Sequence, residues 1–145
     1  MIEYLVEPQV YIDTDNIAHK GKMISAVVDN RVVGRTGYVE WKRGIYQDNG
    51  LNTARLKIAN DTFEIWVNEQ MRGQHLGEGL IGRLFKELTQ GGYNQLVILG
   101  ATQKAKGFYD RMFEKLIQTG QVSSFYSRIR YLFEIPDFVY DVRIF

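Results

Sequence analysis

Apolar and aromatic residues gather in three runs near the start of the chain, at residues 4–12, 23–28 and 31–41. These runs are rich in Val, Ile and Tyr, which favour strands. The dipeptide Asp29-Asn30 separates the second run from the third, and such a pair between two apolar runs is typical of a tight hairpin turn. The first third of the chain therefore predicts antiparallel strands.

The pattern changes near the middle of the chain. Residues 62–67 alternate apolar and polar positions with a period of two, which predicts a strand. Residues 80–88 place apolar side chains at helical spacing, and the pair Gly91-Gly92 marks the end of that helix. Residues 95–99 form an apolar run of strand length. A strand, a helix and a strand in this order predict a right-handed crossover unit.

A second helix is predicted where apolar residues recur between residues 105 and 116, and Gly120 ends it. Residues 122–135 and 138–145 again read as strands, with Pro136-Asp137 as the turn that lets them pair. The fold class expected is α/β (α+β), a single mixed and mostly antiparallel sheet around a central strand–helix–strand unit. We expect one domain over residues 1–145.

Composition narrows the possible chemistry. The chain has 145 residues, no Cys, and 18 Lys and Arg against 17 Asp and Glu. A length of this order supports a core without disulfides or metals. A net charge of +1 argues against a protein that neutralises many nucleic-acid phosphates. His19 and His75 lie far apart in sequence, so no zinc-ligand spacing is present and we expect no metal.

Neither a membrane span nor a secretory signal is expected. No window approaches the roughly 18 apolar residues of a transmembrane helix. The first ten residues lack a basic stretch followed by an apolar core and a cleavage site. We therefore expect a cytoplasmic protein with no membrane partner.

A glycine-bearing stretch, residues 67–80, connects the predicted central strand to the first helix. A helix start offers unpaired backbone N–H groups and a positive dipole end, and Gly73, Gly77 and Gly79 would let a phosphate approach the main chain. Arg72 adds a full positive charge. Alternatively, the glycines only permit a turn and close packing of the helix on the sheet.

Two familiar phosphate loops do not fit this stretch. A P-loop needs Gly-Lys followed by Ser or Thr, which is absent. The segment from Gly77 to Gly82 spells G-x-G-x-x-G, but its first glycine lies ten positions beyond Val67 and no acidic residue follows Leu99. A Rossmann dinucleotide site is therefore excluded.

The stretch instead resembles the GNAT superfamily of acetyl-CoA-dependent N-acyltransferases, whose signature is Arg or Gln, two residues, Gly, one residue, then Gly or Ala. One register runs from Arg72 to Gly77 and puts His75 at the first glycine; another runs from Gln74 to Gly79. We prefer the first, because it preserves the family's spacing from the preceding strand at Val67.

The resemblance continues downstream, where the segment from Ala105 to Met112 is similar to the family's Ala-x-x-Phe-Tyr-x-x-Leu helix. Together the two matches cover residues 62–118. Thr102 stands where many members have an Asn that contacts the cofactor, and Phe113 stands where the family often has Gly. The two helices that usually form a wall of the acceptor site have no counterpart in residues 13–22.

This resemblance implies an N-acetyltransferase with acetyl-CoA as co-substrate and an amine as acceptor, either a small molecule or a peptide or protein. The backbone near Ile65 and Val67 would pair with the pantetheine arm and polarise the thioester carbonyl. Thr102 would lie at the position of the family's cofactor-contacting Asn. The pyrophosphate would be held by the loop residues Arg72, Gly73, Gln74, His75, Leu76, Gly77 and Glu78.

The same resemblance assigns catalytic roles. Without a Cys or a G-x-S-x-G serine, an acyl-enzyme has no nucleophile, so we expect direct attack by the amine in a ternary complex. Tyr109 would protonate the departing thiolate; alternatively it is a core tyrosine. Glu64 is favoured as general base and Glu69 lies just beyond it, whereas the competing interpretation is that both are solvated carboxylates.

The short segment at residues 13–22 predicts an acceptor groove open on one side. A second subunit, a large acceptor or the polar loop at residues 42–53 could cover it. We rank a homodimer first, because Ile45, Tyr46 and Leu51 are apolar residues in an otherwise polar loop. A function of another class also remains open: a catalytically silent module that binds acyl-CoA as a sensor or interaction surface.

Overall fold

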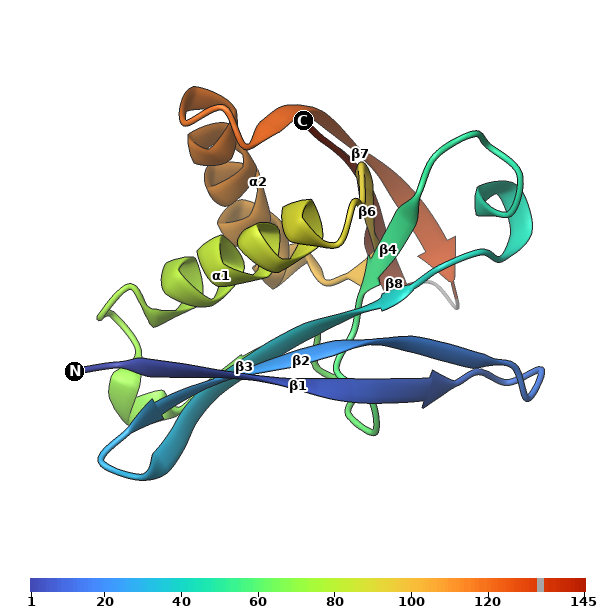
Figure 1. The fold of residues 1–145 in the computed structure, drawn as a ribbon. Coiled ribbons are helices and arrows are strands. Elements are labelled where there is room, and N and C mark those ends of the chain that lie inside the picture. Colours follow the sequence, from blue (N-terminus) through green and yellow to red (C-terminus); the bar gives the residue numbers. More distant parts are fainter. Residues whose placement is uncertain (133–134) are drawn as a thin grey trace. The chain divides into compact units, whose positions relative to one another are not determined.

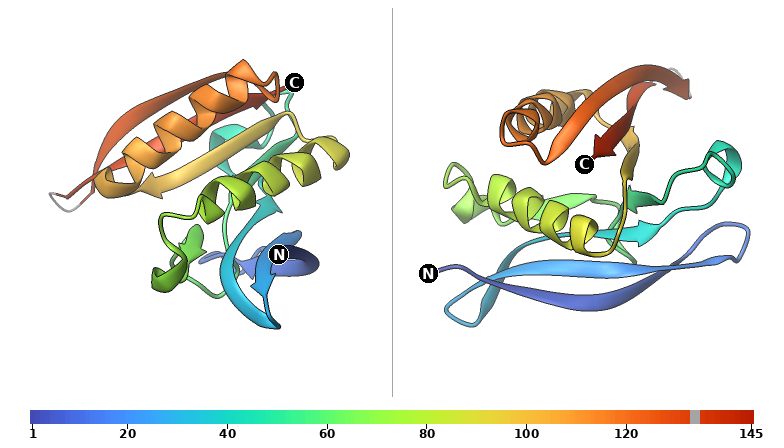
Figure 2. Two further views of the ribbon diagram at one scale, coloured as in Figure 1. Left: turned by 90° about the vertical axis from the view of Figure 1, so that its left-hand side faces the viewer. Right: turned by 45° about the horizontal axis from the view of Figure 1, so that its top comes forward.

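A computed structural model describes residues 1–132 and 135–145. The chain divides into two compact units, each made of two segments: Met1–Trp41 with Leu56–Glu87, and Lys42–Arg55 with Leu88–Phe145. Strands and helices occur in both, and the ribbon is shown in Figures 1 and 2. A mixed and mostly antiparallel α/β fold, as expected from the sequence, is confirmed.

The first unit is an antiparallel sheet of four strands in the order β1-β2-β3-β5. Asp29 and Asn30 both adopt positive φ angles between β2 and β3, so the predicted hairpin turn is confirmed. The strands and the 3-10 helix of this unit are β1 (Glu3–Ile12), β2 (Ala18–Val28), β3 (Arg31–Glu40), β5 (Ile65–Val67) and η2 (Glu69–Met71).

The segment between β1 and β2 contains no helix. Asp13 closes a tight turn: its backbone N–H donates to the Ile17 carbonyl (2.9 Å), and its Oδ1 accepts from the backbone N–H groups of Asp15 and Ile17. Its Oδ2 lies 2.7 Å from Nε2 of His19, which packs against Trp41. The prediction that residues 13–22 hold no pair of wall-forming helices is confirmed, and β2 begins within them at Ala18.

Gln9 is the buried polar anchor of this unit, only 9% exposed. Its Nε2 donates to the carbonyls of Lys22 (3.2 Å), Tyr38 (3.0 Å) and Lys57 (2.9 Å), and its Oε1 accepts from the Ala59 backbone N–H (2.9 Å). One side chain of β1 thus satisfies backbone groups of β2, of β3 and of the segment that follows Leu56.

Helix α1 (Leu76–Gln90) buries one apolar face, as its spacing predicts. It packs on β3 at Gly34, where an added Cβ would lie 2.9 Å from Leu80 and 3.3 Å from Leu76. Gly92 takes a positive φ at the predicted end of the helix. The buried face consists of Leu76, Leu80, Ile81, Leu84, Phe85 and Leu88.

The second unit pairs its strands in the order β4-β6-β8-β7, with β4 parallel to β6 and the other pairs antiparallel. Helix α2 ends at the predicted place, before Gly120 with its positive φ. The elements of this unit are η1 (Gly44–Tyr46), β4 (Thr53–Leu56), β6 (Gln95–Ala101), α2 (Gln103–Gln118), β7 (Val122–Leu132) and β8 (Ile135–Ile144).

The predicted turn at Pro136-Asp137 is wrong. Both residues lie within β8, paired with Tyr131 and Arg130 of β7. The guanidinium of Arg130 donates to both carboxylate oxygens of Asp137 (3.0 and 2.9 Å), and this hydrogen bonding lowers the pKa of Asp137. The part of the predicted strand that falls on residues 133–134 lies outside the described residues.

The loop at residues 42–53 also differs from its prediction. Tyr46 is 7% exposed, and burial, followed by the nearby Asp141 carboxylate, raises the pKa of its hydroxyl. Asn49 donates to the Gln95 side chain (3.1 Å), which fixes the loop to β6. Tyr46 is therefore a core residue and not part of a subunit interface, whereas Ile45 is 73% exposed. The homodimer remains a prediction.

Candidate active site

The loop before α1 is shaped by one side-chain cap and by two residues in the left-handed conformation. The Asn68 side chain accepts from the Gln70 backbone N–H (3.0 Å) and caps η2. Gly73 has a φ of +83° and His75 a φ of +58°. A left-handed conformation is ordinarily supplied by glycine, so His75 has the backbone of a glycine position. This observation supports the register that runs from Arg72 to Gly77.

The first turn of α1 has the features of an anion site. Leu76 is the first helical residue, so the N–H groups that lack intrahelical partners belong to this loop and turn. Arg72, Gly73, Gln74 and His75 are exposed, and nothing lies within 4 Å of a Cβ added at Gly73. Glu78 lies 3.5 Å from Nδ1 of His75 and occupies the same positive helix end.

Gly79 has a packing role. A Cβ added there would collide with the hydroxyl of Tyr4 on β1. This contact with the end of the Tyr4 side chain agrees with the interpretation that Gly79 serves packing, and this glycine lies outside the preferred register.

The strand expected to hold the pantetheine arm is shorter than predicted. Only Ile65–Val67 form β5, because residues 62–64 lie in a bend before the strand. Thr36 donates from its Oγ1 to the Glu64 carbonyl (2.9 Å), which fixes the entry to β5. Among the described strands β5 pairs with β3 alone, so no described strand uses the backbone groups of its other edge.

Tyr109 belongs to an aromatic cluster on the inner face of α2. It is 2% exposed, and its ring lies 6.0 Å from Phe113 and 5.6 Å from Tyr140, measured between centroids. The hydroxyl of Tyr140 donates to Oδ1 of Asp110 (2.6 Å). Burial, assisted by Asp110, raises the pKa of Tyr140. Sequence reasoning missed this Tyr140–Asp110 pair, because nothing in the sequence relates β8 to α2.

Thr102 caps helix α2. Its Oγ1 accepts from the backbone N–H of Ala105 (3.2 Å), which satisfies one of the unpaired groups at the helix start. An Asn at this position could cap the helix in the same way.

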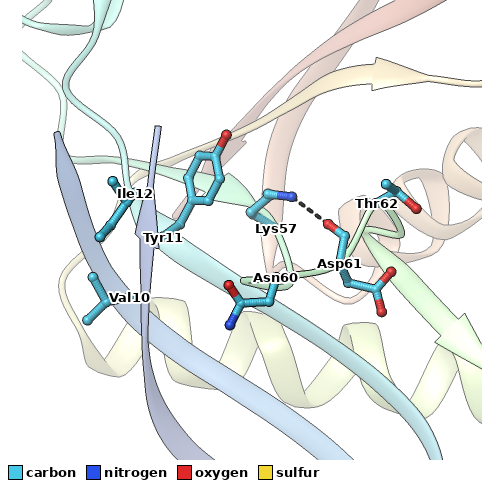
Figure 3. A pocket seen from close by; sticks show the side chains of 7 residues that line it. All are labelled: Val10, Tyr11, Ile12, Lys57, Asn60, Asp61 and Thr62. Atoms are coloured by element: carbon cyan, nitrogen blue, oxygen red, sulfur yellow. Dashed lines mark hydrogen bonds between the residues drawn. The ribbon is translucent and has the colours of Figure 1, made fainter. Parts of the chain in front are cut away.

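A pocket of about 360 Å³ lies in the first unit, beside the end of β1 (Figure 3). Its other wall is the segment between β4 and β5. Sequence reasoning did not identify this pocket, although Asn60-Asp61 is a turn signal. The lining includes Val10, Tyr11, Ile12, Lys57, Asn60 and Asp61.

The expected site residues are distributed over the two units. Arg72 to Glu78, Ile65, Val67 and Glu64 lie in the first unit, and Thr102 and Tyr109 lie in the second. Within the described residues no group of three or more His, Asp or Glu side chains could hold a metal ion. No helix in that part of the chain is long and apolar enough to cross a membrane.

Solved structures of similar fold include acetyltransferases of the GNAT family. An N-acetyltransferase from Staphylococcus aureus Mu50 is 18% identical, with a TM-score of 0.55 over 86% of this chain and 67% of its own. A GNAT-family acetyltransferase from Streptococcus pneumoniae is 12% identical, with a TM-score of 0.58 over the same shares. The chain has the GNAT fold.

A third structure with the GNAT fold, yncA from Salmonella typhimurium, was solved with its cofactor acetyl-CoA. It is 16% identical, and the TM-score is 0.58 over 86% of this chain and 64% of the other. The present chain thus spans about two thirds of the length of these structures. A scan of protein-family models finds no match, and neither does a search of the curated proteins.

Proposed function

We propose that this protein transfers an acetyl group from acetyl-CoA to an amine acceptor. The observation that carries the proposal is the exposed loop before α1, with His75 in a glycine-like conformation, in a chain that has the GNAT fold. The backbone N–H groups from Gly73 to Glu78, with Arg72, would hold the pyrophosphate. The edge of β5 that no described strand pairs with, at Ile65 and Val67, would pair with the pantetheine arm.

The reaction proposed is direct attack in a ternary complex. The amine nitrogen bonds to the thioester carbonyl carbon, the carbon–sulfur bond breaks, and the amine loses one proton while the sulfur gains one. Glu64, at the entry to β5, is proposed to accept the proton from the amine. Tyr109 is proposed to protonate the sulfur, with hydrogen bonding in the complex assisting the transfer, because a phenol is ordinarily a weaker acid than a thiol.

A second candidate function is a catalytically silent module that binds acyl-CoA. One observation favours it: Tyr109 is 2% exposed and packed in an aromatic cluster, as a core tyrosine would be. The loop before α1 would then serve as a sensor or partner surface.

A thiol-release assay separates the two functions. The protein is incubated with acetyl-CoA and a panel of amines that includes amino acids, amino sugars and peptides, and free CoA is measured against a no-acceptor control. Acetyltransfer predicts release that depends on at least one amine, with the acetylated product visible by mass spectrometry. Tight binding of acetyl-CoA without release on any acceptor would favour the silent module.

A further inference from the structure

The pocket beside the end of β1 is built by a rigid turn. The Asp61 backbone N–H donates to the Ile58 carbonyl (3.2 Å), and Asn60 has a φ of +66°, as the third position of a type II turn requires. Gln9 holds the start of this turn through the Lys57 carbonyl and the Ala59 N–H. The pocket wall is therefore set before any ligand binds.

A positive charge is fixed at this pocket. The Lys57 ammonium donates to the Asp61 carbonyl (2.6 Å) and lies 4.8 Å from the centroid of the Tyr11 ring. Figure 3 shows its nitrogen directed at the Asp61 carbonyl oxygen. An ammonium group has three donors and a full charge, so it can hold a carboxylate beside that carbonyl.

The remaining lining complements the other parts of a small amine. The Asp61 side chain, whose Oδ1 accepts from the Phe63 N–H (3.0 Å), supplies the one carboxylate of the lining. That carboxylate attracts a protonated amine. Val10 and Ile12 add apolar surface that is about half exposed. The volume of about 360 Å³ is in the lower part of the range for small-molecule sites.

The pocket is also close to the proposed reacting centre along the chain. Thr62, the last lining residue, precedes Glu64 by two positions and Ile65 by three. Three residues span at most about 10 Å. Thr62 therefore lies within about 10 Å of the start of β5, and we place the amine of the bound molecule on the Thr62 side of the pocket.

We propose that this pocket binds the acceptor, and that the acceptor is a free α-amino acid with an apolar side chain, its carboxylate held by Lys57. The inference rests on the proposed acetyltransfer. In this inference the end of β1 and residues 57–62 form the wall of the acceptor site, in place of the two helices that residues 13–22 lack.

The test compares L-leucine with leucinamide and isopentylamine, which lack the carboxylate, as acceptors in steady-state assays. We expect leucine to be preferred in kcat/KM by about 10-fold or more. The variant Lys57→Gln should remove the preference by raising the KM for leucine about 10-fold, with leucinamide unaffected. Lys86→Gln, on the exposed face of α1, is the matched control and should retain the preference. Equal use of the three amines by the native protein would overturn the proposal.

A binding measurement keeps the two proposals apart. Leucine titrated into the ¹⁵N-labelled protein should shift the backbone amides of residues 57–62 saturably, and leucinamide should do so more weakly. Absence of these shifts overturns the acceptor proposal even if acetyl-CoA binds. If leucine shifts these amides but acetyl-CoA neither binds nor is consumed, the pocket is a carboxylate site and the proposed acetyltransfer fails.

Discussion

Replacing Tyr109 with Phe is expected to lower turnover on the order of 100-fold or more. The change deletes one hydroxyl group and keeps the ring that packs against Phe113 and Tyr140. A general acid for the departing thiolate would be lost, while the loop before α1 would be untouched. The measurement is kcat from thiol release, together with the Kd for CoA, which should remain nearly unchanged.

The matched control is Tyr131→Phe, which removes the same hydroxyl from a side chain that is 69% exposed on β7. It should leave kcat as it is in the native protein. An unaltered rate in Tyr109→Phe would make Tyr109 a core residue only, in agreement with its burial.

The second large effect is expected in the free energy of unfolding. Gln9→Leu should lower it by about 3 kcal/mol, because the buried carbonyl of Tyr38 and two part-buried groups, the Lys57 carbonyl and the Ala59 N–H, lose a partner. An unsatisfied buried group costs about 1–3 kcal/mol. Urea unfolding followed by fluorescence measures the change.

Gln118→Leu, at the exposed end of α2, is the control and should change the stability by less than about 0.5 kcal/mol. If Gln9→Leu also changed the free energy of unfolding by less than about 0.5 kcal/mol, the hydrogen bonds of Gln9 would contribute little to the stability of the fold. Gln9→Leu is also expected to weaken leucine binding, since Gln9 holds the turn that carries Asn60.

Local signals in the sequence predicted much of the secondary structure. The pair Asp29-Asn30 specifies its own turn, because both residues tolerate the positive φ of a tight hairpin. Helices α1 and α2 follow from apolar spacing, and Gly92 and Gly120 mark their ends through conformations that other residues adopt at a cost.

Contacts between residues distant in sequence explain why the predicted turn at Pro136-Asp137 is wrong. The sequence predicted a turn at Pro136, yet this residue lies in β8 and pairs with β7. On the other side of β8, the pairing with β6 begins only at Phe138. A strand edge without a partner tolerates the missing proline N–H, and the Arg130–Asp137 ion pair joins the two strands at that place. Neither circumstance can be read from the residues near Pro136.

In the candidate site, too, some features follow from the local sequence and others depend on distant residues. The loop from Arg72 to Glu78 follows from sequence, because glycine content and helix spacing are local. The predicted strand begins only at Ile65, and its entry at Glu64 is held by Thr36, 28 positions earlier. The burial of Tyr46 depends on its packing in the second unit, which composition alone does not indicate. The pocket at residues 57–62 depends on Gln9, almost 50 positions away.

The most direct test of the central claim is the melting temperature of the protein with acetyl-CoA and with free CoA. Both should stabilise it, since the loop before α1 is proposed to bind the pyrophosphate and not the acetyl group; at 100 times the Kd the gain is about 2.7 kcal/mol. Arg72→Ala should weaken both ligands to a similar degree. If neither ligand shifts the melting curve of the native protein at millimolar concentration, the account is contradicted.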